Sequence, residues 1–412
     1  MTSLTLTIER VGAQGDGVAG GVFTPLTLPG EQVSARVAGE RGELEAVLAA
    51  SAERVAPPCP HFGTCGGCAL QHWDHAPYLA WKVEQIRLAL ARERIETAFA
   101  PAFAAQPGSR RRLALHARRA GQGAQIGFKE RRSWRLAPID ACPVADPRLV
   151  AAFPALRRLA APLFEAPKSA PTLHVTLTDT GLDVDISGVE RRAGALSADA
   201  RSQVAEAAAA ADFARVTLDG EILFQAREAV MRIGRAMVVL PPGAFLQAVG
   251  GAEAAMAAFA LEALGDAARV ADLYCGVGAF ALRLAEEASV VAADVAAPAV
   301  RALGAAAGGV AGLKGIATEA RDLARRPLLA AELKRLDAAV IDPPRAGAAE
   351  QHRELAASSL ARVVSVSCNP ATFARDARIL IDAGFALTRV LPVDQFLWSP
   401  HVELVGVFER GG

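Results

Sequence analysis

The fold is decided by the stretch Val270-Ala271-Asp272-Leu273-Tyr274-Cys275-Gly276-Val277-Gly278-Ala279-Phe280-Ala281. It runs from an apolar strand through a tight, glycine-containing turn into a helix. From about residue 245 onward, strand-like and helix-like segments alternate, which predicts a parallel, doubly wound α/β sheet. The expected parallel strands are 269–273, 289–293, 337–341 and 362–366. The last two strands, 386–393 and 402–408, are separated by a short loop, and we expect them to form an antiparallel edge.

The first half of the chain predicts two further units. Residues 1–54 alternate apolar and polar positions over four candidate strands, 4–8, 20–23, 32–37 and 44–47, with turn residues between them. Several short strands in so few residues predict a small β-barrel, with a generic small β-domain as the alternative. Residues 55–240 mix short strands, such as 173–177 and 182–186, with helices such as 78–94, and predict a central α+β unit. The C-terminal segment, residues 241–412, is expected to be the doubly wound domain.

Composition limits the classes of protein that fit. The chain has 412 residues, of which 52% are hydrophobic and 21% are charged, which is enough apolar material for several packed cores. Lys plus Arg equals Asp plus Glu at 44 each, so any nucleic-acid surface must be local. Residues 1–10 do not read as a signal peptide, and we find no apolar stretch long enough to span a bilayer. We therefore expect a soluble, cytoplasmic protein with no membrane partner.

Four of the six cysteines have metal-ligand spacing. Cys59, Cys65 and Cys68 follow the pattern C-x₅-C-x₂-C, and Cys142, followed by a proline, offers a fourth thiolate. Sparse, clustered cysteines in a chain without a signal peptide favour metal or cluster ligation over disulfides. Zinc and iron–sulfur clusters both accept four sulfur ligands, and His61 could replace one cysteine as a zinc ligand. Ligand chemistry alone leaves these alternatives open.

A fifth cysteine lies where chemistry gathers in open α/β sheets. Cys368, in Ser367-Cys368-Asn369-Pro370, follows the expected strand 362–366 at its carboxyl end. On position alone, a buried core cysteine is an equal alternative. The turn at 276–281 is similarly ambiguous by itself, because G-x-G-x-x-A with an acid at Asp294 serves both NAD and S-adenosylmethionine (SAM) enzymes. We expect the remaining cysteine, Cys275, to be a packing residue.

Taken together, the motifs of the second half resemble the uracil-5 RNA methyltransferases. The resemblance rests on Asp272 to Phe280, on Asp342-Pro343-Pro344-Arg345, on the segment around Cys368 and on Glu403 in the last strand. It implies a Rossmann-like SAM methyltransferase domain at 241–412, a TRAM-like, OB-type barrel at 1–54, and a central domain with an iron–sulfur site.

The resemblance also implies roles for individual residues. Cys368 is expected to be the nucleophile and Glu403 the base, whose pKa should be raised towards neutrality by an apolar strand. The expected cofactor-binding residues are Gln247, Tyr274, Asp294 and Asp342. The expected ligands of a 4Fe–4S cluster are Cys59, Cys65, Cys68 and Cys142.

Two further positions concern the expected cofactor site. Asp322 is a candidate for the adenine contact. Ala279 departs from the family, since many relatives carry asparagine there, and its polar contact with the cofactor is therefore absent.

The expected partner is RNA, bound by a monomer. Residues 110–135 hold nine Lys or Arg and one acid, Glu130, together with Phe128 and Trp134. Such a block suits phosphate contact and base stacking, although it would also suit an ordinary solvated face. The cluster cysteines favour 23S rRNA as the substrate, with tRNA as the alternative. A NAD-dependent oxidoreductase and a non-catalytic, redox-sensing RNA-binding protein are the rival classes, and neither explains Cys368.

Overall fold

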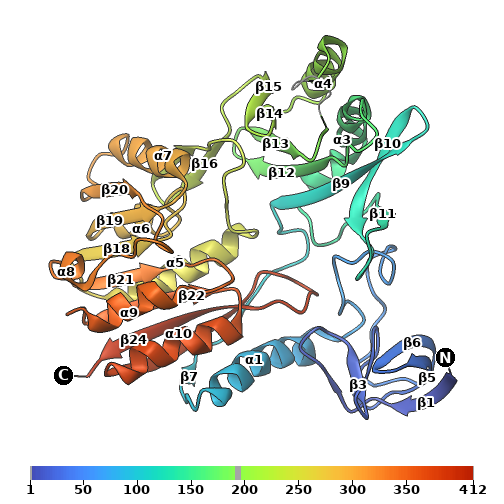
Figure 1. The fold of residues 1–412 in the computed structure, drawn as a ribbon, viewed down its shortest axis with the longest axis horizontal. Helices are drawn as coiled ribbons and strands as arrows, with labels where there is room; N and C mark the ends of the chain where they lie inside the picture. The colour runs from blue at the N-terminus through green and yellow to red at the C-terminus, as the bar shows by residue number, and fades with distance from the viewer. Residues whose placement is uncertain (1, 191–195, 412) are drawn as a thin grey trace.

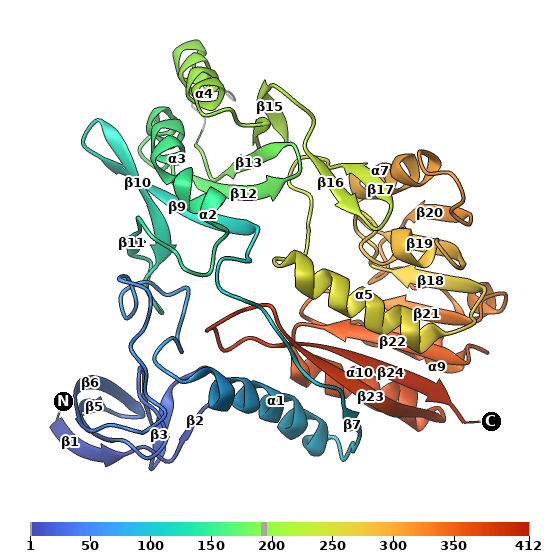
Figure 2. The same ribbon diagram turned by 180° about the vertical axis from the view of Figure 1, so that it is seen from behind.

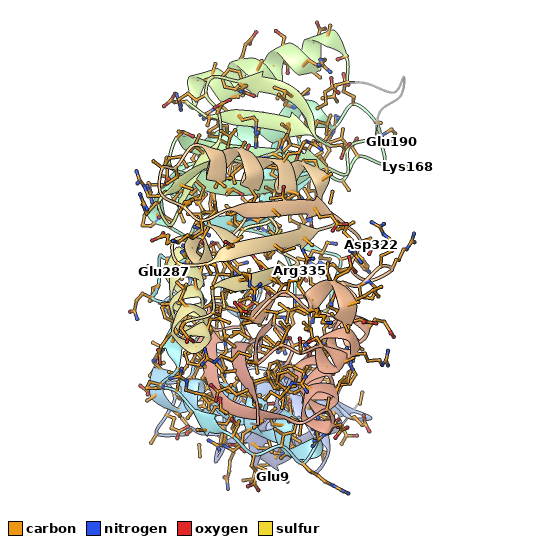
Figure 3. All side chains as sticks on the ribbon, turned by 90° about the vertical axis from the view of Figure 1, so that its left-hand side faces the viewer. Glu9, Lys168, Glu190, Glu287, Asp322 and Arg335 are labelled. Carbon is orange, nitrogen blue, oxygen red and sulfur yellow. The ribbon has the colours of Figure 1, made fainter. Side chains whose placement is uncertain are left out.

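The computed structural model describes residues 2–190 and 196–411. The chain forms three parts: in Figure 1 the C-terminal part lies on the left, the central part at the upper right and the N-terminal part at the lower right, and Figure 2 shows the same arrangement from behind. In the side view of Figure 3, Glu9 of the N-terminal part lies at one end of the molecule, and Lys168 and Glu190 of the central part lie towards the other. Among the described residues, no helix has the length and apolar character needed to cross a membrane.

The N-terminal part is a six-stranded sheet in the order β1-β5-β6-β4-β3-β2. Its strands are β1 (Thr2–Thr7), β2 (Arg10–Val11), β3 (Gly17–Ala19), β4 (Val22–Thr24), β5 (Gln32–Ala38) and β6 (Arg41–Ala49). The expected strand at 20–23 begins two residues too early, since β4 starts at Val22. Gly20 and Gly21 have positive φ of 51° and 84° and form the turn between β3 and β4, a conformation that glycine adopts without steric cost.

The central part is a seven-stranded sheet in the order β11-β10-β9-β12-β13-β14-β15. Its strands are β9 (Arg112–Ala120), β10 (Gly123–Lys129), β11 (Leu136–Pro138), β12 (Thr172–Thr178), β13 (Gly181–Ser187), β14 (Arg215–Leu218) and β15 (Glu221–Gln225). The helices of this part are α2 (Pro147–Ala151), α3 (Phe153–Ala160) and α4 (Ala198–Ala210), with a 3₁₀ turn at Ala161–Leu163. Leucine and valine side chains from the sheet, α3 and α4 make one buried core.

The C-terminal part is a nine-stranded sheet in the order β20-β19-β18-β21-β22-β24-β23-β7, with β8 also pairing β23. Its strands are β18 (Arg269–Leu273), β19 (Ser289–Asp294), β20 (Ile316–Ala320), β21 (Ala338–Ile341), β22 (Arg362–Ser367), β23 (Phe385–Asp394) and β24 (Glu403–Arg410). Strands β18 to β22 are parallel, as the alternating pattern predicts. The strand order reverses between β18 and β21, and ligands of open α/β sheets bind outside such a switch point.

Helices cover both faces of this sheet. They are α5 (Gly250–Leu264), α6 (Ala281–Leu284), α7 (Ala297–Gly308), α8 (Ala330–Leu333), α9 (Ala349–Ala357) and α10 (Pro370–Asp382). A two-stranded hairpin, β16 (Val230–Ile233) and β17 (Ala236–Val239), packs into the same core. Burial on both faces explains why the parallel strands read as nearly continuous apolar runs.

Strand pairing also joins distant parts of the chain. Helix α1 (His75–Arg92) lies beside α10, and the following strands β7 (Ala98–Phe99) and β8 (Phe103–Ala104) pair in parallel with β23 (Figure 1). The last two strands are antiparallel as expected, but β24 lies between β22 and β23, and β23 is covered by β7 and β8. Strand β7 belongs to the expected central domain, 55–240, but it pairs with β23 of the C-terminal sheet. The domain boundaries at residues 54 and 240 therefore remain a proposal.

Candidate active site

Four of the expected site residues lie where strands of the C-terminal sheet end. Tyr274 follows β18, Asp294 ends β19, Asp342 follows β21, and Cys368 follows β22. Since these strands are parallel, their carboxyl ends meet at one edge. Glu403 joins them from the opposite direction, because it begins β24, which runs antiparallel to β22 with Leu404 opposite Ser367.

The turn after β18 has a strained and sterically specified backbone. Tyr274 has a φ of +64°, which is unusual for a residue with a large side chain. Gly278 has a φ of +96°, and a Cβ there would lie 2.5 Å from the Cδ1 atom of Leu303, so close packing of the next helix requires glycine. Gly276 has a φ of +52°, but a Cβ there would meet nothing within 4 Å. The backbone at Gly276 is therefore open to approach by a ligand.

Two acids hold this turn. Asp294 accepts hydrogen bonds from the backbone N–H groups of Gly276 (2.9 Å) and Ala296 (2.8 Å), which fixes the carboxylate at the end of β19. Asp272 is fully buried, and its Oδ2 accepts from the N–H of Ala281 (2.8 Å). Its Oδ1 has no hydrogen-bond partner within the described part of the chain. Burial raises the pKa of Asp272 to about 8. A polar ligand at this turn would satisfy the free oxygen.

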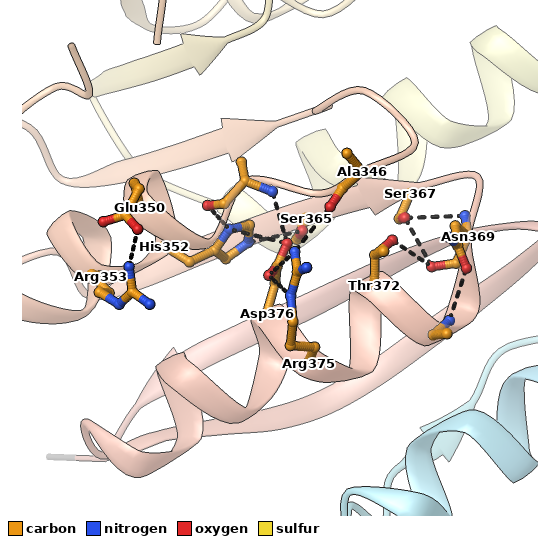
Figure 4. Close-up of polar contacts among 12 residues, drawn as sticks. Ala346, Glu350, His352, Arg353, Ser365, Ser367, Asn369, Thr372, Arg375 and Asp376 are labelled. Atoms are coloured by element: carbon orange, nitrogen blue, oxygen red, sulfur yellow. Dashed lines mark hydrogen bonds and ion pairs between the residues drawn. The ribbon is translucent and has the colours of Figure 1, made fainter. Parts of the chain in front are cut away.

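The turn that carries Cys368 is held on both sides by hydrogen bonds (Figure 4). The hydroxyl of Ser367 accepts from the N–H of Asn369 (3.2 Å), and the Asn369 side chain caps α10 by accepting from Ala371 N (3.1 Å). Asn369 and Thr372 both donate to the carbonyl oxygen of Arg345 (3.3 and 3.2 Å). The thiol and the loop after Asp342 therefore have a fixed relative position.

A second arrangement near this turn resembles a catalytic triad but is buried. His352 lies 3.4 Å from the Ser365 hydroxyl through Nε2 and 3.8 Å from Asp376 through Nδ1 (Figure 4). All three side chains are almost completely buried. Asp376 also accepts from the backbone of Ala348 (2.8 Å), so the group connects α9, β22 and α10 and has a structural role.

Cys368 faces a pocket of about 250 Å³. The walls include Arg345 and His401 from the C-terminal part, Arg92 from α1, and Gln14 from the turn between β2 and β3. The pKa of the thiol is raised by burial and by the charges of Glu403 and Asp342, while Arg345 lowers it. Cys368 is thus accessible from a pocket built by three distant segments and is not the buried core cysteine of the alternative interpretation. Cys275, in contrast, is buried as expected.

Glu403 is 3% exposed, so it is not a strand-edge glutamate facing water. Burial and the neighbouring Asp342 raise its pKa to about 8, in the direction expected from its apolar strand. Asp342 is half-buried; desolvation and the charge of Glu253 raise its pKa to about 7. Gln247 donates to Asp342 (3.1 Å). Gln395, which the sequence analysis missed, donates to both Gln247 and Glu403.

The four cysteines expected to be ligands line one cavity of about 290 Å³. Cys59, Cys65 and Cys68 come from the segment before α1, and Cys142 comes from the segment before α2. His61 lines the same cavity and lies 2.6 Å from Asp140, which connects the two segments. Among residues 2–190 and 196–411, however, no three His, Cys, Asp or Glu side chains are close enough to hold a single metal ion.

The basic run at 110–135 is not one free surface, which corrects part of the prediction. Arg111 donates to Gln247 O (3.0 Å) and pairs with the buried Glu253 (2.6 Å). Arg112 donates to Leu246 O (2.7 Å), and Arg110 donates to Arg112 O (2.9 Å). The guanidinium groups of Arg111 and Arg112 thus hold the segment that carries Gln247, because its carbonyl groups need donors. Further along, both Arg131 and Arg132 pair with Asp16 of the N-terminal part (2.6 Å each).

Other residues of the basic run line a cavity of about 760 Å³ on the central sheet. Its lining includes Arg118, Lys129, Trp134 and Arg135. Trp134 is 87% exposed, and the Lys129 ammonium lies 3.9 Å from the centre of its ring. Exposed aromatic rings beside cations suit stacking on unpaired bases with phosphates nearby.

The strand order and the residues at the strand ends define an open α/β protein with a candidate ligand site at the carboxyl edge of its sheet, and comparisons identify the family. Residues 215–410 match the tRNA (Uracil-5-)-methyltransferase family. An RNA methyltransferase of Caulobacter vibrioides is 63% identical and covers 98% of this chain and 99% of its own length. The 23S rRNA (uracil(1939)-C(5))-methyltransferase RlmD of Halomonas elongata is 34% identical over 98% of this chain and 89% of its own.

A solved structure has the same overall fold. The tRNA (uracil-54, C5)-methyltransferase of Pyrococcus abyssi, in complex with S-adenosyl-L-homocysteine, superposes with a TM-score of 0.74 at 22% identity, over 98% of this chain and 99% of that one. The protein belongs to the RNA (uracil-5-)methyltransferase family and is an RNA methyltransferase.

Proposed function

We propose that this enzyme methylates C5 of a uridine in 23S rRNA, with SAM as the methyl donor and a covalent bond between Cys368 and C6 of the base. The observation that carries the proposal is the meeting of Cys368 and Glu403 at the ends of two adjacent antiparallel strands, beside a pocket of about 250 Å³. A thiol and a carboxyl group so arranged supply a nucleophile and a base to one ring.

The chemistry needs both groups because uracil C5 is a poor nucleophile. The Cys368 thiolate adds to C6, and the electron pair of the C5–C6 double bond becomes available at C5. A C5–methyl bond would form with that pair as the methyl–sulfur bond of SAM breaks, its electrons staying on the donor sulfur. Glu403 then takes the C5 proton, the double bond reforms, and the bond between C6 and sulfur breaks to regenerate the thiolate. Splitting one difficult substitution into addition and elimination is the usual gain of nucleophilic catalysis.

The turn at 274–278 and its neighbours suit SAM. The open backbone at Gly276, the carboxylate of Asp294 at the next strand end and the unpartnered oxygen of Asp272 can receive a polar ligand at the switch point. Tyr274, Asp294, Asp342 and Gln247 would hold the cofactor, which supplies an electrophilic methyl group. Arg111 and Arg112 would support Gln247 through the backbone.

The substrate base must leave its stack to reach Cys368. We infer that the pocket lined by Cys368, Arg345 and His401 receives the flipped uridine, and that the cavity around Trp134 binds a nearby single-stranded segment. The cations at Arg118, Lys129 and Arg135 would contact its phosphates. The choice of 23S rRNA follows the relative from Halomonas elongata, and tRNA is the alternative.

We also propose that the four cysteines hold a 4Fe–4S cluster. The four cysteines, which come from two distant segments of the chain, line one cavity of about 290 Å³. A cubane of eight atoms keeps its cysteine ligands further apart than one ion does. Four thiolates suit either a cluster or zinc, the family resemblance favours the cluster, and no step of the methyl transfer needs it.

Nucleoside mass spectrometry tests the function. Ribosomal and transfer RNA from cells with the gene, without it, and complemented with Cys368→Ala would be purified, digested and compared. Loss of one 5-methyluridine from 23S rRNA in the second and third strains supports the proposal. Loss from tRNA alone favours the alternative substrate, and unchanged 5-methyluridine in both RNAs contradicts the function.

A further inference from the structure

Gln395 occupies the centre of the site although no motif points to it. It is 1% exposed and directly follows β23, in the loop that leads to Glu403. Its Nε2 donates to Gln247 Oε1 (2.7 Å) and to the carboxylate of Glu403, and its Oε1 accepts from the N–H of Ala248 (3.1 Å). The backbone N–H can only donate, so the amide orientation is fixed with its two N–H bonds towards Gln247 and Glu403.

This amide ties the base to the expected cofactor segment. The two hydrogens of a planar NH₂ group point in set directions, so Gln247 and Glu403 are held at a fixed separation. Gln247 in turn donates to Asp342 (3.1 Å). One chain of hydrogen bonds thus runs from the end of β21 through Gln247 and Gln395 to the start of β24, and it connects the two acids nearest Cys368.

The loop that carries Gln395 is itself anchored by α1. The preceding residue, Asp394, is fully buried and accepts from Tyr78 OH (2.7 Å) and from the Lys82 ammonium. Lys82 also donates to Phe396 O (3.0 Å), and Tyr78 accepts from the N–H of Trp398 (2.7 Å). Two side chains of one helix therefore fix the backbone on both sides of Gln395.

The other face of the same loop meets the cysteine segment. Trp398 O accepts from the N–H groups of Ala69 and Leu70 (2.9 and 3.0 Å), which directly follow Cys68. Phe396, Leu397 and Ser399 line the cavity of the four cysteines. The loop between β23 and β24 is thus packed between the cysteine cavity and the base.

We propose that Gln395 is a positioning residue of the methyl transfer, which aligns Glu403 for removal of the C5 proton and is kept in register by its anchor on α1. The inference rests on the proposed function, since it gives Gln395 a role in the elimination step. No contact of Gln395 with the base or the methyl donor is required; it acts through Glu403. Its hydrogen bond also favours the ionised carboxylate, the form that accepts a proton.

The test uses Gln395→Met, which keeps a side chain of similar length and removes both donated hydrogen bonds. Methylated adduct should form as in the wild type, but its breakdown should slow about 100-fold, since a base displaced by about 1 Å loses that much. SAM binding should stay near normal. In the wild type, the hydrogen bond from Gln395 lowers the pKa of Glu403, so its removal should raise that pKa. The breakdown rate of the variant should therefore reach its plateau at a higher pH than in the wild type.

Two variants separate positioning from general damage. Gln351→Met is the matched control, because Gln351 is equally buried and exchanges hydrogen bonds with the backbone of Leu328. Leu328 lies just before α8, outside the proposed site. This control should leave the breakdown rate and its pH dependence unchanged. Tyr78→Phe removes the hydroxyl that holds Asp394 and Trp398, and it should slow the same step by a smaller factor.

A denaturing gel of labelled RNA, with Glu403→Gln beside these variants, decides the outcome. A trapped band for Glu403→Gln but wild-type breakdown for Gln395→Met overturns the role of Gln395. Equal, pH-independent losses in Gln395→Met and Gln351→Met would also overturn it. No adduct in any protein, Glu403→Gln included, would instead overturn the covalent mechanism on which the inference rests.

Discussion

Cys368 and Glu403 lie across from each other where β22 ends and β24 begins, although 34 residues separate them in the chain. The negative charge of Glu403 raises the pKa of the Cys368 thiol, and burial raises the pKa of Glu403 to about 8. If Cys368 is the nucleophile and Glu403 the base, as proposed, two groups with raised pKa values define how the activity should depend on pH.

Both groups must be deprotonated for a complete turnover, and both pKa values are raised, so release of methylated RNA should become faster as the pH rises from about 6.5 to 9. The sign follows because the fraction of thiolate and of carboxylate increases with pH. Single-turnover rates at constant ionic strength would measure it. An activity that is flat or falling over this range would contradict the assigned roles.

The metal content tests the cysteine cavity. Protein purified without oxygen should be brown and should contain about four iron and four labile sulfide per chain. Cys142→Ser should lower the iron content, because Cys142 lines the same cavity as the other three cysteines. Cys275→Ser, which changes a buried cysteine elsewhere, is the control. Stoichiometric zinc without iron would contradict the cluster.

RNA binding should depend on the exposed cations and not on the first three arginines of the basic run. Replacing Lys129 and Arg135 with glutamine should weaken binding and reduce the salt slope by about 1.4, since each single-strand phosphate contact contributes about 0.7. Trp134→Ala should lower affinity by about 1–3 kcal/mol through lost stacking.

The matched control removes two exposed charges elsewhere, with Arg158→Gln on α3 and Arg301→Gln on α7. Its salt slope should equal that of the wild type. A slope unchanged by the Lys129 and Arg135 substitutions would mean that the Trp134 cavity is an ordinary solvated surface.

The anchor of the loop before Glu403 should be a stability determinant. Lys82 and Asp394 are both fully buried and paired, so Lys82→Met leaves an unpaired buried carboxylate and should destabilise the fold by about 3–5 kcal/mol. Chemical denaturation would measure the loss. Lys82→Met combined with Asp394→Asn should recover part of it, and no recovery would argue against the pairing.

Much of the C-terminal fold could be predicted because its signals are local. The strand at 269–273 agrees with β18, and the expected strands around 289, 337 and 362 agree with β19, β21 and β22 within one or two residues. Continuous apolar runs between helices specify buried parallel strands. The location of β24 between β22 and β23, and of β7 beside β23, depends on long-range pairing that no local pattern encodes.

In the site, too, local patterns predict some features and long-range contacts decide others. The local pattern places the glycines, the acids and Cys368 at strand ends, and the family resemblance assigns their roles, whereas Gln395 has no signal of its own beyond being near Glu403. The arginines at 110–112 were misinterpreted because a basic run gives no information about its partners. The partners of Arg111 and Arg112, which are Leu246, Gln247 and Glu253, lie more than a hundred residues away. A charged run thus predicts a surface only where no buried acid or carbonyl group takes up its donors.

The most direct measurement is the covalent bond itself. Wild type, Cys368→Ala and Glu403→Gln would each be incubated with SAM and labelled RNA and run on a denaturing gel. The account predicts no shifted band for Cys368→Ala, which cannot add to C6, and a persistent band of methylated RNA for Glu403→Gln, which cannot remove the C5 proton. Turnover by Cys368→Ala, or normal turnover without a trapped band by Glu403→Gln, would contradict it.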